Sequence, residues 1–347
     1  MNNNINYKHT SLCCLLWISV IVLLSGCSQN EDITSKSESD ILIPIEISGI
    51  HVAQSKSIET QPYTADRVLI LPFKKINESI TTNDDTNFAP DYANAKQVNI
   101  NSTTSYMTML NLTASSTYKV LVIGYNRNDY DFNNQGSVSN RFSIGSVTLP
   151  TTLSNFHLLS GSAASIPEFF TATCQSYNGA TLIGAYFKPN QIKTLKANLT
   201  RLVSGLNVDI TNIPTYITSI TLIAEKLVKG IKPTDGTATV LQLATDADNL
   251  KTFSTKIPAS GKVSFNHYIL PTLDLNKTKL YLDVKYGSFT ERYMIKVPDS
   301  AGVSATNSIT FTSNHVVSIT GNYTLINLGF TINGNINLDD NSWDGIQ

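Results

Sequence analysis

The residue best placed for chemistry lies near the start of the chain, at Cys27. An apolar run over residues 11–24 ends in two small residues and then this cysteine. Such a run has the plan of a secretory signal, and it is shorter than the roughly 20 apolar residues that a membrane-spanning helix needs. Small side chains before the cysteine suit a signal peptidase. Cleavage there would make Cys27 the new N-terminal residue.

The order Leu24-Ser25-Gly26-Cys27 resembles the lipobox of bacterial lipoproteins. This resemblance implies that residues 1–26 are removed and that Cys27 carries lipid on its sulfur and amino group. Two or more acyl chains hold a protein stably on a bilayer, so the outer membrane becomes an expected partner. Residues 29–32 look like the acidic export signal of surface lipoproteins, which predicts exposure on the cell surface. The alternative is an ordinary signal peptide with a chance cysteine.

Other reactive residues form no pattern of a known catalytic or metal site. The mature histidines have neither a second histidine nor a cysteine at ligand spacing. They are His51, His157, His267 and His315. No nucleophile elbow or phosphate-binding glycine loop occurs. We therefore predict no catalytic residue, no resident metal and no cofactor.

One loop resembles a calcium-binding loop, because the oxygen-bearing residues Asp129, Asp131 and Asn133 stand at every second position. An EF-hand loop would need Gly at the position of Asn134 and Glu at the position of Asn140. The pattern fails at both, so a solvated loop is the preferred interpretation.

Composition narrows the class of protein further. The formal net charge is −1, and no basic patch is visible, which argues against a nucleic-acid partner. Cys174 is the only cysteine besides Cys27 after the signal, so an intrachain disulfide framework is excluded. Charged residues make up only 15% of the chain, and Asn, Ser and Thr are abundant. This balance is typical of an extracellular β-rich protein.

The first ordered element is predicted just after a polar tether, residues 27–40. Ile41, Ile43, Ile45 and Ile47 alternate with other residues, which indicates a strand with one buried face. Pro44 cannot donate a ladder hydrogen bond, so we expect this strand at the edge of its sheet.

Many more short apolar runs follow at spacings near ten residues, with no sustained helical period. Residues 118–125 are apolar on both faces, which predicts a central strand. Residues 279–286 and 289–297 predict a hairpin, residues 308–311 a further strand, and Leu202 is expected to share a strand face with Leu206. The pattern predicts an all-β chain of sandwiches, divided into a signal (1–26), a lipidated tether (27–40) and two β-sandwich domains (41–194 and 195–347).

Several motifs resemble the FimB/Mfa2 family of the Bacteroidetes fimbrillin superfamily, lipid-anchored anchor and accessory subunits of fimbriae. Besides the lipobox, the matching stretches are residues 66–73, 116–125, 199–208, 321–328 and 343–345. The resemblance implies two tandem transthyretin-like Greek-key β-sandwiches, a role in cell adhesion without enzymatic activity, and other fimbrial subunits as partners. It also implies assembly by strand exchange, in which an extended segment of one subunit fills a groove in the next.

In such a scheme residues 41–52 would supply the N-terminal strand. A stalk subunit loses that strand by cleavage after a basic residue, whereas an anchor keeps it. Lys56 is the basic residue best placed for cleavage, because Arg67 abuts the next predicted strand. The lack of an arginine between Ile41 and the middle of the following loop favours an anchor or accessory subunit. Ser300, within Asp299-Ser300-Ala301, resembles an O-glycosylation acceptor.

Two other functions stay open. The chain could be a surface lipoprotein that binds glycans for an uptake system, which a cluster of exposed aromatic residues would favour. A surface glycosidase is the less favoured alternative, since it needs two convergent carboxylates in a cleft.

Overall fold

Strands dominate the chain, as the sequence predicted. The computed structural model describes residues 39–49, 65–100, 105–128, 151–160, 164–241, 250–272, 278–298, 305–306, 308–324 and 331–337. Helical structure within these ranges is limited to short 3-10 turns, among them η1 (Asp85–Asn87), η2 (Tyr92–Asn94), η3 (Leu153–Asn155) and η4 (Pro189–Gln191). The described strands all belong to one compact unit, residues 40–347. The chain is therefore all-β.

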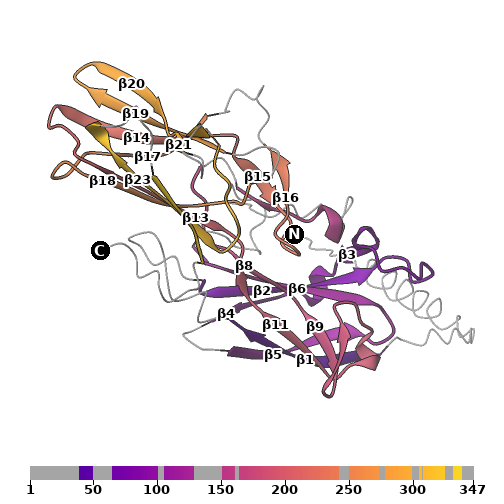
Figure 1. Cartoon of the computed structure of the whole chain (residues 1–347). Coiled ribbons are helices and arrows are strands. Elements are labelled where there is room, and N and C mark those ends of the chain that lie inside the picture. The colour runs from indigo at the N-terminus through magenta and orange to yellow at the C-terminus, as the bar shows by residue number, and fades with distance from the viewer. Residues whose placement is uncertain are drawn as a thin grey trace, which may run out of the picture. The chain divides into compact units, whose positions relative to one another are not determined.

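Two sheets are built mainly from the first half of the chain (Figure 1). The first sheet has the order β10 (Thr181–Gly184), β9 (Gln175–Asn178), β11 (Thr194–Asn198), β1 (Asp40–Ser48) and β5 (Ser105–Thr113). The second sheet has the order β12 (Thr200–Arg201), β8 (Phe170–Thr173), β6 (Tyr118–Tyr125), β2 (Arg67–Lys75) and β3 (Phe88–Pro90), and β4 (Lys96–Asn99) also pairs with β2.

A shared apolar core joins these two sheets. Ile43, Ile45 and Ile47 of the first sheet belong to one buried cluster with Val120 and Val122 of the second. Alternation puts every second residue of β1 into this core. The side chains of β6 are buried on both faces, which confirms the prediction of a central strand.

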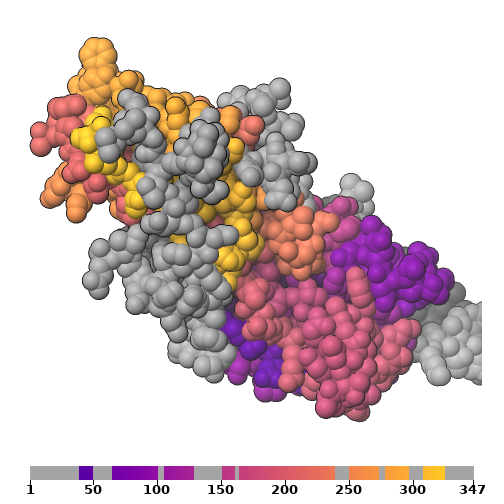
Figure 2. All heavy atoms as spheres, viewed as in Figure 1, coloured from indigo at the N-terminus to yellow at the C-terminus, as the bar shows by residue number. Residues whose placement is uncertain are grey.

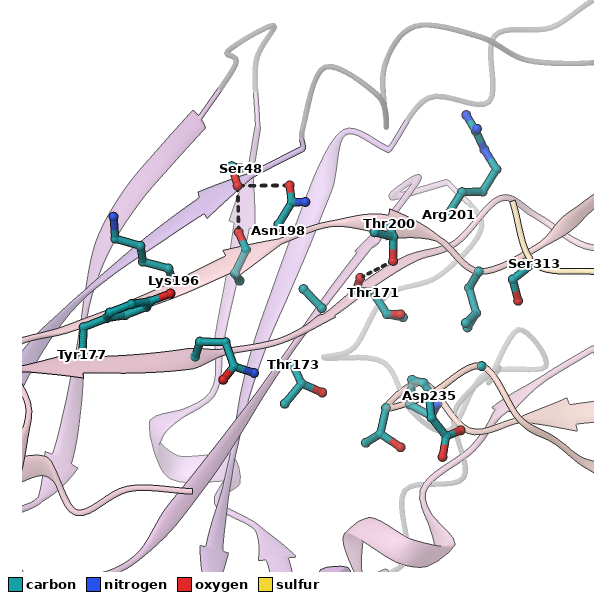
Figure 3. Close-up of a pocket in the computed structure, with 17 residues that line it drawn as sticks. Ser48, Thr171, Thr173, Tyr177, Lys196, Asn198, Thr200, Arg201, Asp235 and Ser313 are labelled. Carbon is teal, nitrogen blue, oxygen red and sulfur yellow. Dashed lines mark hydrogen bonds between the residues drawn. The ribbon is translucent and has the colours of Figure 1, made fainter. Parts of the chain in front are cut away.

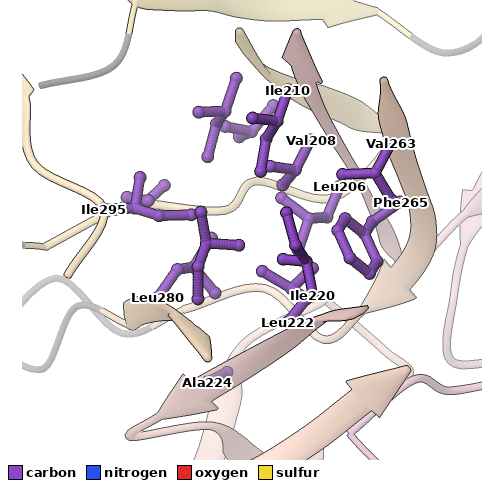
Figure 4. Packing of buried hydrophobic residues seen from close by; sticks show 14 of the residues in the cluster. Leu206, Val208, Ile210, Ile220, Leu222, Ala224, Val263, Phe265, Leu280 and Ile295 are labelled. Carbon is purple, nitrogen blue, oxygen red and sulfur yellow. The ribbon is translucent and has the colours of Figure 1, made fainter. Parts of the chain in front are cut away.

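Two further sheets come from the second half. The third has the order β18 (Val263–Ile269), β13 (Ser204–Thr211), β23 (His315–Asn322) and β24 (Thr331–Asn337). The fourth has the order β17 (Leu250–Lys256), β14 (Ile217–Glu225), β19 (Lys279–Tyr286) and β20 (Phe289–Met294). Their inner faces meet in a second apolar cluster, drawn in Figure 4. The β19–β20 pairing confirms the predicted hairpin, with Gly287 at φ +57° in its turn.

A third cluster lies on the other face of the second sheet. It combines Leu69 and Leu121 of that sheet with Val228, Tyr268 and other residues from the second half. A small sheet of β16 (Ala238–Leu241), β15 (Val228–Ile231) and β7 (Leu158–Leu159) contributes to it, and β21 (Val297–Pro298) pairs separately with β22 (Ala305–Thr306). Apolar contacts thus link the first half of the chain to the second.

Some predicted elements differ from the structure. Residues 308–311 form no strand, only a single bridge between Thr278 and Ile309. The apolar character of this run is explained by the Ile309 side chain, which packs in the second cluster. Leu202 precedes β13 and packs in the third cluster, whereas Leu206 packs in the second. The predicted boundary between residues 194 and 195 falls inside β11. The division into two domains stays a prediction.

Candidate strand-exchange site

The predicted N-terminal strand is β1, and it pairs along its whole length with β5. The pairing is antiparallel and runs from Asp40 opposite Thr113 to Ser48 opposite Ser105. On the other side, β1 pairs in parallel with β11, from Ile45 opposite Leu195 to Ser48 opposite Asn198. Figure 1 shows β1, β5 and β11 lying side by side in the first sheet. A segment early in the chain is thus inserted between two later strands.

This arrangement corrects the prediction drawn from Pro44. We expected an edge strand, but β1 lies between two neighbours. Pairing with β11 begins only at Ile45, one residue after the proline. Within the described residues, positions 40–44 therefore pair with β5 alone. Pro44 stands where β1 lacks its second neighbour, so its missing N–H breaks no pairing with β11.

The inner face of β1 is fully desolvated. Ile45 and Ile47 are 0% exposed, and Ile43 is nearly so. Leu110 and Leu112 of β5 and Leu195 of β11 belong to the same cluster. Burying an isoleucine side chain contributes roughly 1.5–3 kcal/mol, so these three residues account for much of the attachment of β1.

The same cluster holds Cys174 and Tyr118. Burial raises the pKa of the Cys174 thiol, which keeps it protonated and unreactive, as expected for a buried small side chain. Burial also raises the pKa of Tyr118, whose hydroxyl accepts a hydrogen bond from the Thr113 amide at 3.3 Å. Both groups are structural parts of the core.

The outer face of β1 mixes charge with exposed apolar surface. The Glu46 carboxylate lies 3.5 Å from the Lys196 ammonium of β11. Leu42 is 60% exposed, and Met107 and Met109 of β5 are exposed as well. Such exposed pairs contribute little to stability. The strand is therefore held mainly by its inner face and its ladders.

Both ends of β1 are fixed by short polar contacts. At the start, the Asn111 side-chain amide donates to Asp40 at 3.0 Å. At the end, the Ser48 hydroxyl donates to the Ala197 carbonyl at 3.2 Å. Gly49 then turns the chain at φ +77°, where an added Cβ would lie 2.5 Å from the Leu199 carbonyl oxygen. The exit from β1 thus requires glycine.

The sequence predicted the four isoleucines on one strand, and the structure brings Ile43, Ile45 and Ile47 into one core with Ile41 packed against it. Arg67 is the first residue of β2, and its Nε donates to the Asn99 side-chain oxygen at 2.9 Å. The other predicted site residues lie outside the described residues. They are Leu24, Ser25, Gly26, Cys27, Lys56 and Ser300.

Sequence reasoning missed the residues that contact β1 from its two neighbouring strands. Leu195 and Ala197 of β11 flank β1, yet β11 was expected to open the second half of the chain. Leu110 and Leu112 of β5 pack in the same core cluster as the isoleucines of β1. Their alternation was visible in the sequence, but nothing local identifies a parallel partner so far along the chain.

No group of three or more His, Cys, Asp or Glu side chains close enough to hold a metal ion occurs in the described part of the chain. In those same ranges, no helix has the length and apolar character needed to cross a membrane.

Comparison with known proteins finds similar solved structures but no match by sequence. No protein-family model matches the chain, and no curated protein matches it by sequence. A candidate adhesin from Bacteroides ovatus is 11% identical, with a TM-score of 0.48, over 86% of this chain and 93% of its own. The fimbrial anchor protein Mfa2 from Porphyromonas gingivalis is 12% identical, with a TM-score of 0.41, over 81% of this chain and 91% of its own.

The tip fimbrial protein Mfa3 from Porphyromonas gingivalis is 10% identical, with a TM-score of 0.38, over 81% of this chain and 94% of its own. These neighbours are fimbrial proteins and candidate adhesins of Bacteroidetes, the kind of protein that the sequence motifs resemble. At these identities and TM-scores the likeness transfers no residue's role to this chain.

Proposed function

We propose that this chain is a lipid-anchored fimbrial subunit that joins its partner by β-strand exchange. The observation that carries the proposal is the position of β1. It follows the tether from Cys27 directly and lies between β5 and β11 with its isoleucines in the core. Lipid anchor and groove-filling strand would then share one short N-terminal segment.

The chemistry of exchange follows from this position. Removal of β1 would open a groove whose two walls, β5 and β11, each lose a neighbouring strand. An extended segment from another subunit could restore both ladders and refill the pockets of Ile43, Ile45 and Ile47. Ladder hydrogen bonds supply affinity in such a complex, and alternate side chains supply specificity.

We further propose the anchor or accessory type, which keeps β1. Cleavage at Arg67 would cut into β2, where Arg67 pairs with both Asn99 of β4 and Tyr125 of β6. That cut would remove a rung from the second sheet. Retention of β1 leaves the protein on the outer membrane through lipid on Cys27, with the fold displayed at the cell surface for adhesion.

The anchor type is tested on protein purified from the cells that make it. Mass spectrometry of the N-terminal peptide should find acylated Cys27 joined to the residues of β1. A mature N-terminus after residue 52 would contradict the anchor type and favour a stalk subunit.

Strand exchange is tested with a protease site inserted between β1 and β2. After cleavage and removal of the N-terminal fragment in denaturant, a synthetic peptide of residues 39–49 should restore the original unfolding midpoint. The matched control is the same peptide with Ile45→Asp, which should not restore it. Equal recovery with both peptides, or with neither, would contradict strand exchange.

A further inference from the structure

A cleft beside β8 and β11 has features that strand exchange does not need. Its volume is about 550 Å³, within the range of roughly 300–1,000 Å³ found for small-molecule sites. Its walls come from β8, β9, β11 and β12, from the last residue of β1 and from the turn at residues 233–236 (Figure 3). In Figure 2 the pink surface around β8 to β12 adjoins the salmon surface of the β15–β16 hairpin that carries this turn.

Both cations that line the cleft are paired with carboxylates, and the remaining charge is the Asp235 carboxylate, which accepts a hydrogen bond from the Thr237 amide at 2.8 Å. The Lys196 ammonium lies 3.5 Å from the Glu46 carboxylate. Arg201 is bonded to Glu168, with its Nε 2.5 Å from the carboxylate and both side chains almost fully buried. A phosphate or sulfate group would need a cation free to pair with it. An anionic ligand is therefore a poor match for these walls.

Neutral polar groups supply most of the remaining lining. They can donate and accept hydrogen bonds. They are Ser48, Thr171, Thr173, Gln175, Asn198, Thr200, Thr234 and Ser313. The Tyr177 ring lies at one end of the cleft (Figure 3), with the Lys196 ammonium 5.7 Å from its centre, and Ala172 adds a small apolar surface. The walls combine hydroxyls, amides and one aromatic ring.

One of these groups is buried without a partner. The Thr173 hydroxyl oxygen has no hydrogen-bond partner among the described residues. In Figure 3 it is directed to the same side of the cleft as Asp235. A buried polar atom without a partner costs roughly 1–3 kcal/mol, and such atoms are few in folded proteins. This oxygen is shielded from solvent although the residue is half-buried, so a rotation of the Thr173 side chain would be needed for a ligand hydroxyl to satisfy it, directly or through one water molecule.

We propose that this cleft binds a neutral carbohydrate, a mono- or disaccharide unit of a larger glycan. Sugar hydroxyls both donate and accept, so they complement the threonine, serine and amide groups of the walls. The apolar face of a sugar ring suits the Tyr177 ring and the Ala172 methyl group. This site goes beyond the proposed role in assembly, because a subunit held by lipid and strand exchange needs no pocket here.

The test uses the full chain with β1 in place, purified in a detergent without sugar headgroups. Maltose, cellobiose, lactose, mannobiose and chitobiose are titrated by calorimetry or by saturation-transfer NMR. We expect at least one disaccharide to bind. Heparin and a polar decapeptide serve as charged and peptide probes, and binding of either one without any disaccharide would overturn the proposal. Binding of no probe at all would overturn it too.

Thr173→Val supplies the decisive variant because it removes only the unpartnered hydroxyl. We expect sugar affinity to fall roughly 2- to 10-fold, the equivalent of one hydrogen bond, while the melting temperature stays equal or rises. Thr290→Val, on the exposed surface of β20, is the matched control and should change neither value. Gln175→Ala, on the cleft wall, should also weaken binding.

Sugar binding that is unchanged in both Thr173→Val and Gln175→Ala would place the ligand elsewhere and overturn the proposal. The outcome is independent of strand exchange, since β1 stays paired throughout. A chain that binds sugar through Thr173 but does not exchange its strand would leave this site standing and remove only the assembly role.

Discussion

Ile45 of β1 lies directly opposite Leu195 of β11 in a parallel pairing, although most of the first half of the chain separates them. Both side chains are completely buried in the core between the first and second sheets. The pair marks the point at which the N-terminal strand acquires its second neighbour. An exchanged strand would have to reproduce the contacts that β1, near the start of the chain, makes with β11.

The first prediction concerns this inner face. Ile45→Ala should destabilise the fold by about 2–5 kcal/mol, because it removes buried methyl groups and leaves a cavity. Leu42→Ala, three positions earlier on the exposed face of the same strand, should stay within about 0.5 kcal/mol of the parent. Urea unfolding of both variants gives the comparison. Similar losses in the two would mean that β1 is not held by its isoleucines.

The sequence predicted β1 well as a local element but poorly as part of a sheet. Alternating isoleucines identified both the strand and its buried face, since period-2 burial is a local property. Pro44 suggested an edge position, yet its effect is confined to the segment where β11 is absent. The contacts of β1 with Leu195 and Ala197 could not be predicted from the sequence, because this parallel pairing depends on closure of a very long loop.

The second prediction concerns the buried pair Arg201 and Glu168. Arg201→Met should destabilise the chain by about 3–5 kcal/mol, since it leaves the Glu168 carboxylate buried without its cation. It also removes the hydrogen bond from Arg201 Nη1 to the Asn314 side-chain oxygen, at 3.2 Å. Thermal or chemical unfolding measures the loss.

The double variant Arg201→Met with Glu168→Met is the control for this pair. Replacing both charges by apolar side chains is often neutral for stability, so the double variant should be more stable than Arg201→Met alone. If the double variant were the less stable of the two, the cost would come from lost packing and not from an uncompensated charge.

The third prediction is a pH dependence that arises at His267. Burial, with a smaller contribution from the charge of Lys256, lowers the pKa of His267 from 6.5 to about 4 in the folded chain. Its Nε2 lies 3.0 Å from the Ser254 hydroxyl, and its ring stacks on Phe253. Between these two pKa values the unfolded chain binds more protons than the folded one. Stability due to His267 is therefore complete above pH 6.5 and is lost as the pH falls towards 4.

The full effect of His267 on the free energy of unfolding is about 3 kcal/mol, at about 1.36 kcal/mol for each pKa unit. Urea unfolding of the parent and of His267→Gln at pH 7 and pH 4.5 measures it. The parent should lose about 2–3 kcal/mol more than the variant between these two pH values. Equal losses would show that folding does not lower the pKa of His267.

The fourth prediction compares two glycines that share a left-handed backbone but differ in their surroundings. Gly49 has φ +77°, and a Cβ there would lie 2.5 Å from the Leu199 carbonyl oxygen. Gly287 has φ +57° and nothing within 4 Å of such a Cβ. Gly287→Ala should therefore lower the free energy of unfolding by about 1–2 kcal/mol, the strain of a non-glycine residue in this conformation. Gly49→Ala adds a collision with backbone and should cost clearly more.

Unfolding midpoints of the two alanine variants test this difference. Because Gly49 ends β1, its substitution should also loosen the β1–β11 ladder, visible as faster amide hydrogen exchange at Ile47 than in the Gly287 variant. The Leu199 carbonyl must move away before the new methyl group fits. This shift would also disturb the hydrogen bond that the Leu199 amide donates to the Ser48 carbonyl at 3.0 Å. Equal costs at the two sites would mean that the exit from β1 is free to shift, and that the strand is less firmly seated than its buried isoleucines indicate.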